Sequence, residues 1–272
     1  MLLAALTVGG VGLLNRYVHG ALVDGSRHLK SLRVLSWNIG KIYLPLDSRA
    51  ADRDLEHVAR VIAEADPQIV ALQELRGPRQ LGRLLARLGP RWRGSVPEDR
   101  YDRRAALLTE LPVRFLEIET STGRTAQGAE VTLGDGSKAT VASVHLDAFD
   151  PERRARQAEE ILDSLARLGN EQMVLAGDFN FDSAAIRHDS PDYRTYLLLT
   201  ANLIDAAKRE GGTTVLAQRL DYVFYRLVGV QQAQSQVLFG RRINIMDHDP
   251  LVVEIFRHRG WGGAPQLRPA GD

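Results

Sequence analysis

The feature that most constrains the fold of this chain is an apolar run that ends abruptly. Residues 174–176 are apolar, Gly177 follows, and then Asp178 and Asn180 place a carboxylate and a carboxamide two positions apart. Residues i and i+2 of a strand point to the same side. If the chain stays extended as far as Asn180, both side chains project from the end of a buried strand into one site. That pair suits the activation of water beside a phosphate, although a strand that runs into an Asp-rich turn would give the same pattern.

The same arrangement recurs along the chain. Polar residues adjoin short apolar segments at five further places, namely Asn38, Glu74, His145, Asp221 and the pair Asp247-His248. One such residue is usually a cap for the strand end, but six coincidences favour a shared edge. Sheets gather their strand ends at one edge, and binding sites form there.

The residue types at these positions fit one chemistry. Glu74 and Asp247 are hard oxygen ligands, which favour Mg²⁺ or Mn²⁺ over zinc in a chain without cysteine. Asp178 can take a proton from water, with Asn180 orienting that water or the phosphate.

The two histidines complete this set. His145 and His248, when protonated, can neutralise negative charge on phosphoryl oxygens. Asp221 can hold His248 in its cationic form, because a carboxylate beside an imidazole stabilises the imidazolium. Together with a general base, these groups predict hydrolysis of a phosphoester.

Hydrophobic periodicity predicts many strands and few helices. Apolar residues in a helical stripe predict a helix over 52–65, and others are expected over 79–88, after the cap Asp150, and near 193–199. Strands are expected over 32–37, 69–72, 105–109, 113–119, 130–133, 138–145, 173–176, 220–225, 231–238 and 251–256. Gly134-Asp135-Gly136 predicts a hairpin. Strands joined by hairpins, with a few helices, favour a two-sheet sandwich flanked by helices.

The two ends of the chain differ from the region between them. Residues 2–14 are apolar and carry no charge, but they are fewer than the roughly 20 residues that a membrane span needs. We expect residues 1–31 to be an N-terminal segment and linker, residues 32–257 a catalytic domain and residues 258–272 a loose tail. An anchor or signal remnant and an ordinary docked helix are both open readings of residues 2–14, so the location is open between cytoplasmic and membrane-associated or exported.

Composition excludes some chemistries. The net charge is +1, so the whole chain has no strong field for nucleic acid or an anionic membrane. All but four of the 35 basic residues are arginine, which suits bidentate phosphate contacts. The absence of cysteine excludes disulfides, thiolate catalysis and cysteine metal sites.

As a set, these motifs resemble the endonuclease/exonuclease/phosphatase superfamily, the metal-dependent phosphoesterases that include DNase I. The matching stretches occur in the family's order, and they are Ser36-Trp37-Asn38-Ile39, Leu72-Gln73-Glu74, Ser143-Val144-His145-Leu146, Gly177-Asp178-Phe179-Asn180, Leu220-Asp221-Tyr222-Val223-Phe224 and Asp247-His248-Asp249-Pro250. The resemblance implies an α/β, four-layer α/β/β/α sandwich of two mixed sheets. It implies Mg²⁺, or Mn²⁺ in its place, at Asn38, Glu74 and Asp247. The same resemblance implies Asp178 as base, Asn180 on the phosphate, Asp221 paired with His248, and His145 as the second catalytic histidine.

Departures from particular subfamilies narrow the resemblance. Exonuclease III-like enzymes have no histidine at the position of His145, and the Trp-Cys-Asp-Arg stretch of the inositol 5-phosphatases is impossible without cysteine. What remains is the broad group with a His-Leu-Asp type of motif, which holds sphingomyelinase-like and tyrosyl-DNA phosphodiesterase 2-like enzymes.

The substrate is open at this level. Arg103 and Arg104, near Tyr101, are candidates for phosphate contacts with nucleic acid. The hypotheses are a phosphodiesterase acting on nucleic acid or nucleotides, a lipid or small-molecule phosphoesterase with a membrane contact through residues 2–14, and a catalytically silent binding module. No obligate protein partner is evident in the sequence.

Overall fold

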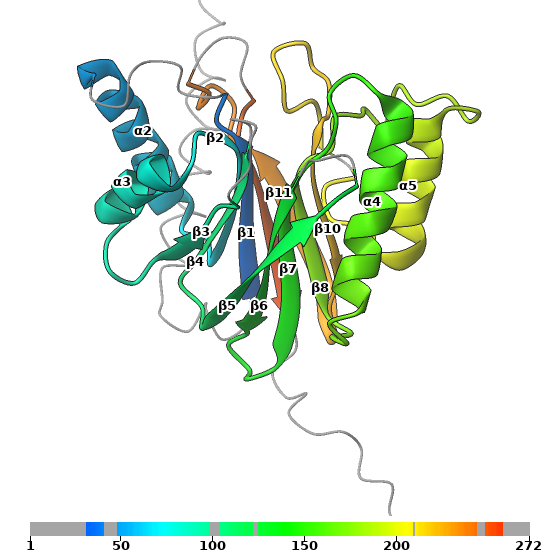
Figure 1. The fold of residues 1–272 in the computed structure, drawn as a ribbon, viewed down its shortest axis with the longest axis horizontal. Helices are drawn as coiled ribbons and strands as arrows, with labels where there is room; N and C mark the ends of the chain where they lie inside the picture. Colours follow the sequence, from blue (N-terminus) through cyan, green and yellow to red (C-terminus); the bar gives the residue numbers. More distant parts are fainter. Residues whose placement is uncertain are drawn as a thin grey trace, which may run out of the picture.

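A computed structural model of the protein describes residues 31–40, 48–97, 104–121, 125–208, 210–243 and 248–257. Two six-stranded mixed sheets lie face to face, and helices cover their outer faces (Figure 1). This is the four-layer sandwich that the sequence predicts.

The first sheet has the strand order β11-β12-β1-β2-β4-β3. Its strands are β1 (Ser31–Asn38), β2 (Ile69–Leu75), β3 (Arg93–Ser95), β4 (Arg104–Thr109), β11 (Val230–Val237) and β12 (Leu251–Arg257). Strands β1 and β2 are parallel, and the other neighbours in this sheet are antiparallel. The carboxyl ends of β1 and β2 therefore lie at the same edge.

The second sheet has the strand order β5-β6-β7-β8-β10-β9. Its strands are β5 (Val113–Glu119), β6 (Thr125–Thr132), β7 (Lys138–His145), β8 (Met173–Asp178), β9 (Ile204–Asp205) and β10 (Asp221–Arg226). The pair β7–β8 is parallel, while β10 runs antiparallel to β8. The carboxyl ends of β7 and β8 thus meet the beginning of β10.

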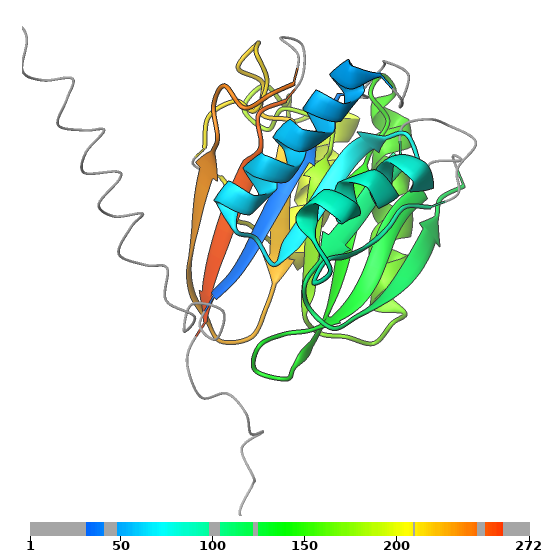
Figure 2. The same ribbon diagram turned by 90° about the vertical axis from the view of Figure 1, so that its left-hand side faces the viewer.

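Helices α2 (Arg49–Ala65) and α3 (Pro78–Leu88) cover the first sheet, and α4 (Pro151–Ala166) and α5 (Pro191–Asn202) cover the second. Asp150 caps α4 as predicted, since its side chain accepts hydrogen bonds from the backbone N–H groups of Glu152 and Arg153. Figure 2 shows α2 and α3 lying across their sheet, with β11 and β12 beside them.

Three apolar layers hold this arrangement together. The inner layer lies between the sheets and includes Val34, Ala71, Val141 and Ala176. The two outer layers join each sheet to its helices. No helix in the described part of the chain is long and apolar enough to cross a membrane; the apolar residues 2–14 lie outside that part.

Several boundaries differ from the sequence expectation. Strand β2 continues to Leu75, beyond the expected end at 72, through an irregular register between Leu72 and Leu75. Strand β6 begins earlier than expected, and the short strands β3 and β9 were not predicted. The Gly134-Asp135-Gly136 hairpin between β6 and β7 is confirmed, with Gly136 at φ 82°.

Candidate active site

The predicted polar residues that the structure describes converge on one edge of the sandwich, the upper edge in Figure 1. In the second sheet, Asp178 pairs with His145 on one side and with Asp221 on the other. In the first sheet, Asn38 ends β1 beside the carboxyl end of β2. The parallel pairs therefore bring side chains that are distant in sequence to a single edge.

Asp178 lies at the centre of this group. Its carboxylate Oδ2 accepts a hydrogen bond of 3.0 Å from Nδ2 of Asn38, which crosses from the first sheet to the second. The same oxygen lies 3.7 Å from Nε2 of His145 and 3.8 Å from Nε2 of His248. Asp178 is only 1% exposed, so its charge faces these polar groups rather than bulk water.

His248 is held in its cationic form. Its Nδ1 lies 2.6 Å from Oδ2 of the fully buried Asp221. Burial disfavours the imidazolium, but the carboxylates of Asp221 and Asp178 outweigh burial and raise the pKa of His248 from 6.5 to about 10. The expected pairing of these two residues is present in the structure, and Nε2 of His248 is directed to the Asp178 side.

The approach to Asn180 differs from the sequence expectation. Strand β8 ends at Asp178, and Asn180 has a left-handed backbone with φ 54°, so the chain does not stay extended. A tight turn replaces the strand, because the Asn180 N–H donates to Oδ1 of Asp178 at 2.9 Å. Nδ2 of Asn180 donates to the carbonyl of Leu146 at 3.1 Å, next to His145. The premise of two side chains on one face of a strand was wrong, although the two residues are close together.

Glu74 and Asn38 supply oxygens at the same edge. Glu74 has a left-handed backbone with φ 62° in the irregular part of β2, and its charge contributes to the raised pKa of His248. Within the described ranges no cation pairs with the Glu74 carboxylate. Oδ1 of Asn38 accepts from the N–H of Gly40 and retains a second lone pair.

These donors fit a hard divalent cation. A carboxylate and an amide oxygen are ligands that Mg²⁺ accepts, and a cation would offset the charges of Glu74 and Asp178. The third predicted ligand, Asp247, lies outside the described residues, and those residues contain no cluster of three His, Asp or Glu side chains suited to a metal. The metal set of Asn38, Glu74 and Asp247 therefore stays a prediction.

The structure gives little evidence on the two arginines that were predicted to contact the substrate. Arg104 begins β4 at this edge, where its Nη1 donates to the carbonyl of Arg76 at 2.7 Å and packs over Gly77. Arg103 lies outside the described residues. Their role in substrate binding stays a prediction.

Sequence reasoning gave no role to the groups that support the site. Gln73 is fully buried, and its Nε2 donates to Oγ of Ser143 at 3.3 Å between the two sheets. Oγ of Thr213 accepts from the N–H of Asp221 at 3.3 Å. Gln73 and Ser143 stand inside the quoted motifs, and their polar character within apolar strands was the available signal.

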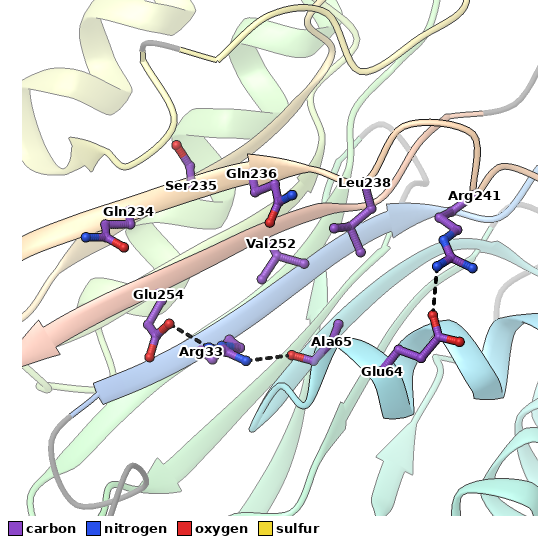
Figure 3. Close-up of a pocket in the computed structure, with 10 residues that line it drawn as sticks. All are labelled: Arg33, Glu64, Ala65, Gln234, Ser235, Gln236, Leu238, Arg241, Val252 and Glu254. Atoms are coloured by element: carbon purple, nitrogen blue, oxygen red, sulfur yellow. Dashed lines mark hydrogen bonds and ion pairs between the residues drawn. The ribbon is translucent and has the colours of Figure 1, made fainter. Parts of the chain in front are cut away.

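A separate pocket lies on the outer face of the first sheet. Figure 3 shows its lining residues, most of which come from β11, β12, β1 and the end of α2. The volume of the pocket is about 360 Å³. The charged side chains that line this pocket pair with one another, Arg33 with Glu254 and Arg241 with Glu64. This pocket contains none of the predicted catalytic residues.

Several solved structures have the same fold as this chain. The catalytic domain of human Nocturnin with bound sulfate matches with a TM-score of 0.65 and 20% identity, over 84% of this chain and 95% of that one. Truncated Caenorhabditis elegans TDP2 matches with a TM-score of 0.63 and 19% identity, over 83% and 98%. An endonuclease/exonuclease/phosphatase from Bacteroides vulgatus matches with a TM-score of 0.62 and 18% identity, over 84% and 99%. These identities are too low to transfer a substrate.

The sequence itself gives the family. A comparison with curated proteins finds no significant match. The model of the endonuclease/exonuclease/phosphatase family, however, matches residues 35–242, which span β1 to the end of β11 and include most of the predicted catalytic residues. This chain belongs to the endonuclease/exonuclease/phosphatase family.

Proposed function

We propose that this chain is a divalent-metal-dependent phosphodiesterase in which Asp178 accepts a proton from the attacking water. Members of its family are hydrolases that act on phosphoesters. The observation that carries the finer proposal is the position of Asp178, whose Oδ2 lies within 4 Å of Asn38 and of both histidines. A general base beside two potential cations is an arrangement that suits attack on a phosphoryl group.

Each of the residues near Asp178 has a distinct role in the proposed hydrolysis. A water oxygen forms a bond to phosphorus as its proton passes to Asp178, and one ester P–O bond breaks. The imidazolium of His248 donates to a phosphoryl oxygen as negative charge grows there, and Asp221 keeps that imidazolium charged. His145 faces the same carboxylate from the neighbouring strand, and we assign it to a second phosphoryl oxygen.

Asn180 and the metal residues position the substrate. The amide of Asn180 is fixed by the carbonyl of Leu146, which leaves its oxygen for the water or the phosphate. Asn38, Glu74 and Asp247 would hold the metal. When bound, Mg²⁺ or Mn²⁺ supplies a Lewis acid that polarises the phosphoryl group and stabilises the leaving oxygen.

The test is a substrate panel run with Mg²⁺, Mn²⁺ or EDTA. The panel contains bis-p-nitrophenyl phosphate, p-nitrophenyl phosphate, plasmid DNA, single-stranded DNA, RNA and phospholipid vesicles. We expect Asp178→Asn to lower turnover at least about a hundredfold, as loss of a general base does. Asp189→Asn is the matched control, because Asp189 forms only an exposed ion pair with Arg187.

The outcomes separate the hypotheses. Metal-dependent turnover that disappears in Asp178→Asn but not in Asp189→Asn supports the proposal. Full activity in EDTA removes the metal from the mechanism. Turnover within a few-fold of wild type in Asp178→Asn refutes the assignment of the base, and an inert protein on every substrate favours the binding module.

A further inference from the structure

Exposed apolar side chains gather at the edge that carries the candidate active site. Within the described residues, seven large hydrophobic side chains are exposed, and four of them belong to loops at this edge. We call these four the apolar rim, and they are Phe149 (87% exposed), Val215 (42%), Leu216 (71%) and Phe239 (68%). Single exposed apolar residues are ordinary, but four in the loops at the edge that carries one site need an explanation.

The structure holds Phe149 outward. It lies four residues after His145, and its N–H donates to Oδ1 of Asp147 at 2.9 Å. Asp147 is itself fixed, because its N–H donates to Oε1 of the buried Gln157 on α4. The exposure of Phe149 therefore follows from a defined turn.

Val215 and Leu216 occupy the tip of a second defined turn. The N–H of Thr213 donates to the carbonyl of Gln218 at 2.8 Å, and this bond closes the turn. Thr214 pairs with His248 through an isolated antiparallel bridge. The exposed tip is thus attached directly to a predicted catalytic histidine.

Phe239 belongs to a third loop at the same edge. It directly follows Leu238, whose N–H donates to the carbonyl of Pro250, two residues after His248. The three loops of the rim thus adjoin His145 or His248. By contrast, exposed Val228 lies in the turn after β10, at the opposite edge of the sheet.

We propose that the apolar rim inserts into a phospholipid bilayer and that the substrate is the headgroup phosphodiester of a lipid in that bilayer. This inference rests on the proposed phosphodiesterase function. Apolar loop tips around a polar site suit an interface where one layer is apolar and the next carries phosphate. The reaction is hydrolysis: water bonds to the lipid phosphorus, one ester P–O bond breaks, and a phosphomonoester and an alcohol are released.

Three described ion pairs near the site favour a lipid over nucleic acid. Arg153, in the first turn of α4, pairs with Asp147, and the loop residues Arg241 and Arg242 pair with Glu64 and Asp249. These three arginines are already engaged by carboxylates. A net charge of +1 gives the whole chain little attraction for a polyanion. Apolar insertion needs no such field, and the chain carries a second apolar element in residues 2–14.

The first experiment locates docking and does not depend on catalysis. Because the chain has no cysteine, Leu216→Cys and Val228→Cys each provide one thiol for the same environment-sensitive fluorophore. Vesicles of phosphatidylcholine and sphingomyelin are added to each labelled full-length protein. We expect a blue shift and reduced access of an aqueous quencher at position 216, with no change at 228.

The label at 228 also controls for the N-terminal segment. If residues 2–14 alone bound the vesicle, both labels would stay in water. An unchanged label at 216, equal shifts at both positions, or a shift at 216 that appears with protein concentration and without lipid would each overturn the rim as a bilayer contact. The last of these outcomes would assign the rim to a second copy of the chain.

The second experiment measures catalysis at the surface. The readout is the ratio of vesicle-lipid turnover to turnover of soluble bis-p-nitrophenyl phosphate. Phe149→Ser should lower this ratio at least about tenfold, a factor of the order expected for burying one such side chain. Val228→Ser should leave the ratio at the wild-type value. An unchanged ratio in Phe149→Ser overturns the proposal.

The two experiments separate two kinds of failure. A protein that turns over neither the soluble diester nor the lipid refutes the proposed function, while the label at 216 still tests docking. A protein that cleaves the soluble diester but not the lipid keeps the proposed function and refutes the lipid substrate.

Discussion

The raised pKa of His248 predicts a pH dependence of stability that one substitution should weaken. With its pKa at about 10 in the folded protein and 6.5 when unfolded, His248 binds its proton more tightly in the folded state. Burial alone would lower the pKa of His248, and the nearby carboxylates raise it by more than burial lowers it. The nearest of these carboxylates is that of Asp221, at 2.6 Å. Asp221→Asn should lower the pKa of His248 by about 1–3 units, the usual effect of one opposite charge in contact.

The sign follows from proton linkage. Below pH 6.5 both the folded and the unfolded protein hold the proton, and the His248 contribution to the free energy of unfolding is fully present. As the pH rises from 6.5 towards 10, only the folded state keeps it, and the contribution is lost. A shift of this size corresponds to a contribution on the order of 5 kcal/mol at most, and coupling to Asp221 makes the measured part smaller. Asp221→Asn should therefore show a shallower fall in stability across this pH range.

Two measurements in EDTA check this prediction. The pKa comes from the ring ¹⁵N signals of His248, assigned by their absence in His248→Gln. The stability comes from urea unfolding at pH 6 and pH 9. A His248 that titrates near 6.5 in the wild type, or the same pKa in Asp221→Asn as in the wild type, would refute the electrostatic reasoning.

Two further substitutions test how the fold positions the site. Gly177→Ala should lower the free energy of unfolding by at least about 3 kcal/mol, because its Cβ would lie 2.0 Å from the backbone oxygen of Val144; Gly82→Ala on α3, with open space around it, should be neutral or stabilising by up to about 1 kcal/mol in the same urea titration. Asp249→Ala should lower stability by about 2–3 kcal/mol, because the buried carboxylate that accepts from the N–H of Arg241 and pairs with Arg242 is lost. Asp249→Asn should recover part of that loss in the same assay, and equal stabilities for the two variants would contradict this role.

The sequence was most informative where local chemistry decides structure. The apolar stripe of α2, the cap at Asp150 and the turn at Gly136 depend on neighbouring residues, and all three are present. The fold class followed from the number of strands and hairpins together with the family's motifs.

The sequence was least informative where long-range pairing decides structure. The continuation of β2 past Leu72 depends on its pairing with β4, which places Leu75 opposite Arg104. The left-handed backbone of Asn180 accompanies a hydrogen bond to Asp178 and another to the carbonyl of Leu146, which directly follows the neighbouring strand β7. Periodicity within one segment contains no information about either partner.

The site also depends on a distance that no motif encodes, namely the separation of the two sheets. The hydrogen bond between Asn38 and Asp178 joins β1 of one sheet to β8 of the other, and Gln73 and Ser143 form a second link between β2 and β7. Small residues such as Ala71 and Ala176 stand in the apolar layer between the sheets. Because a buried layer is close-packed, its side chains fix the separation of the two sheets. The catalytic geometry is therefore a property of the core as much as of the polar residues at its edge.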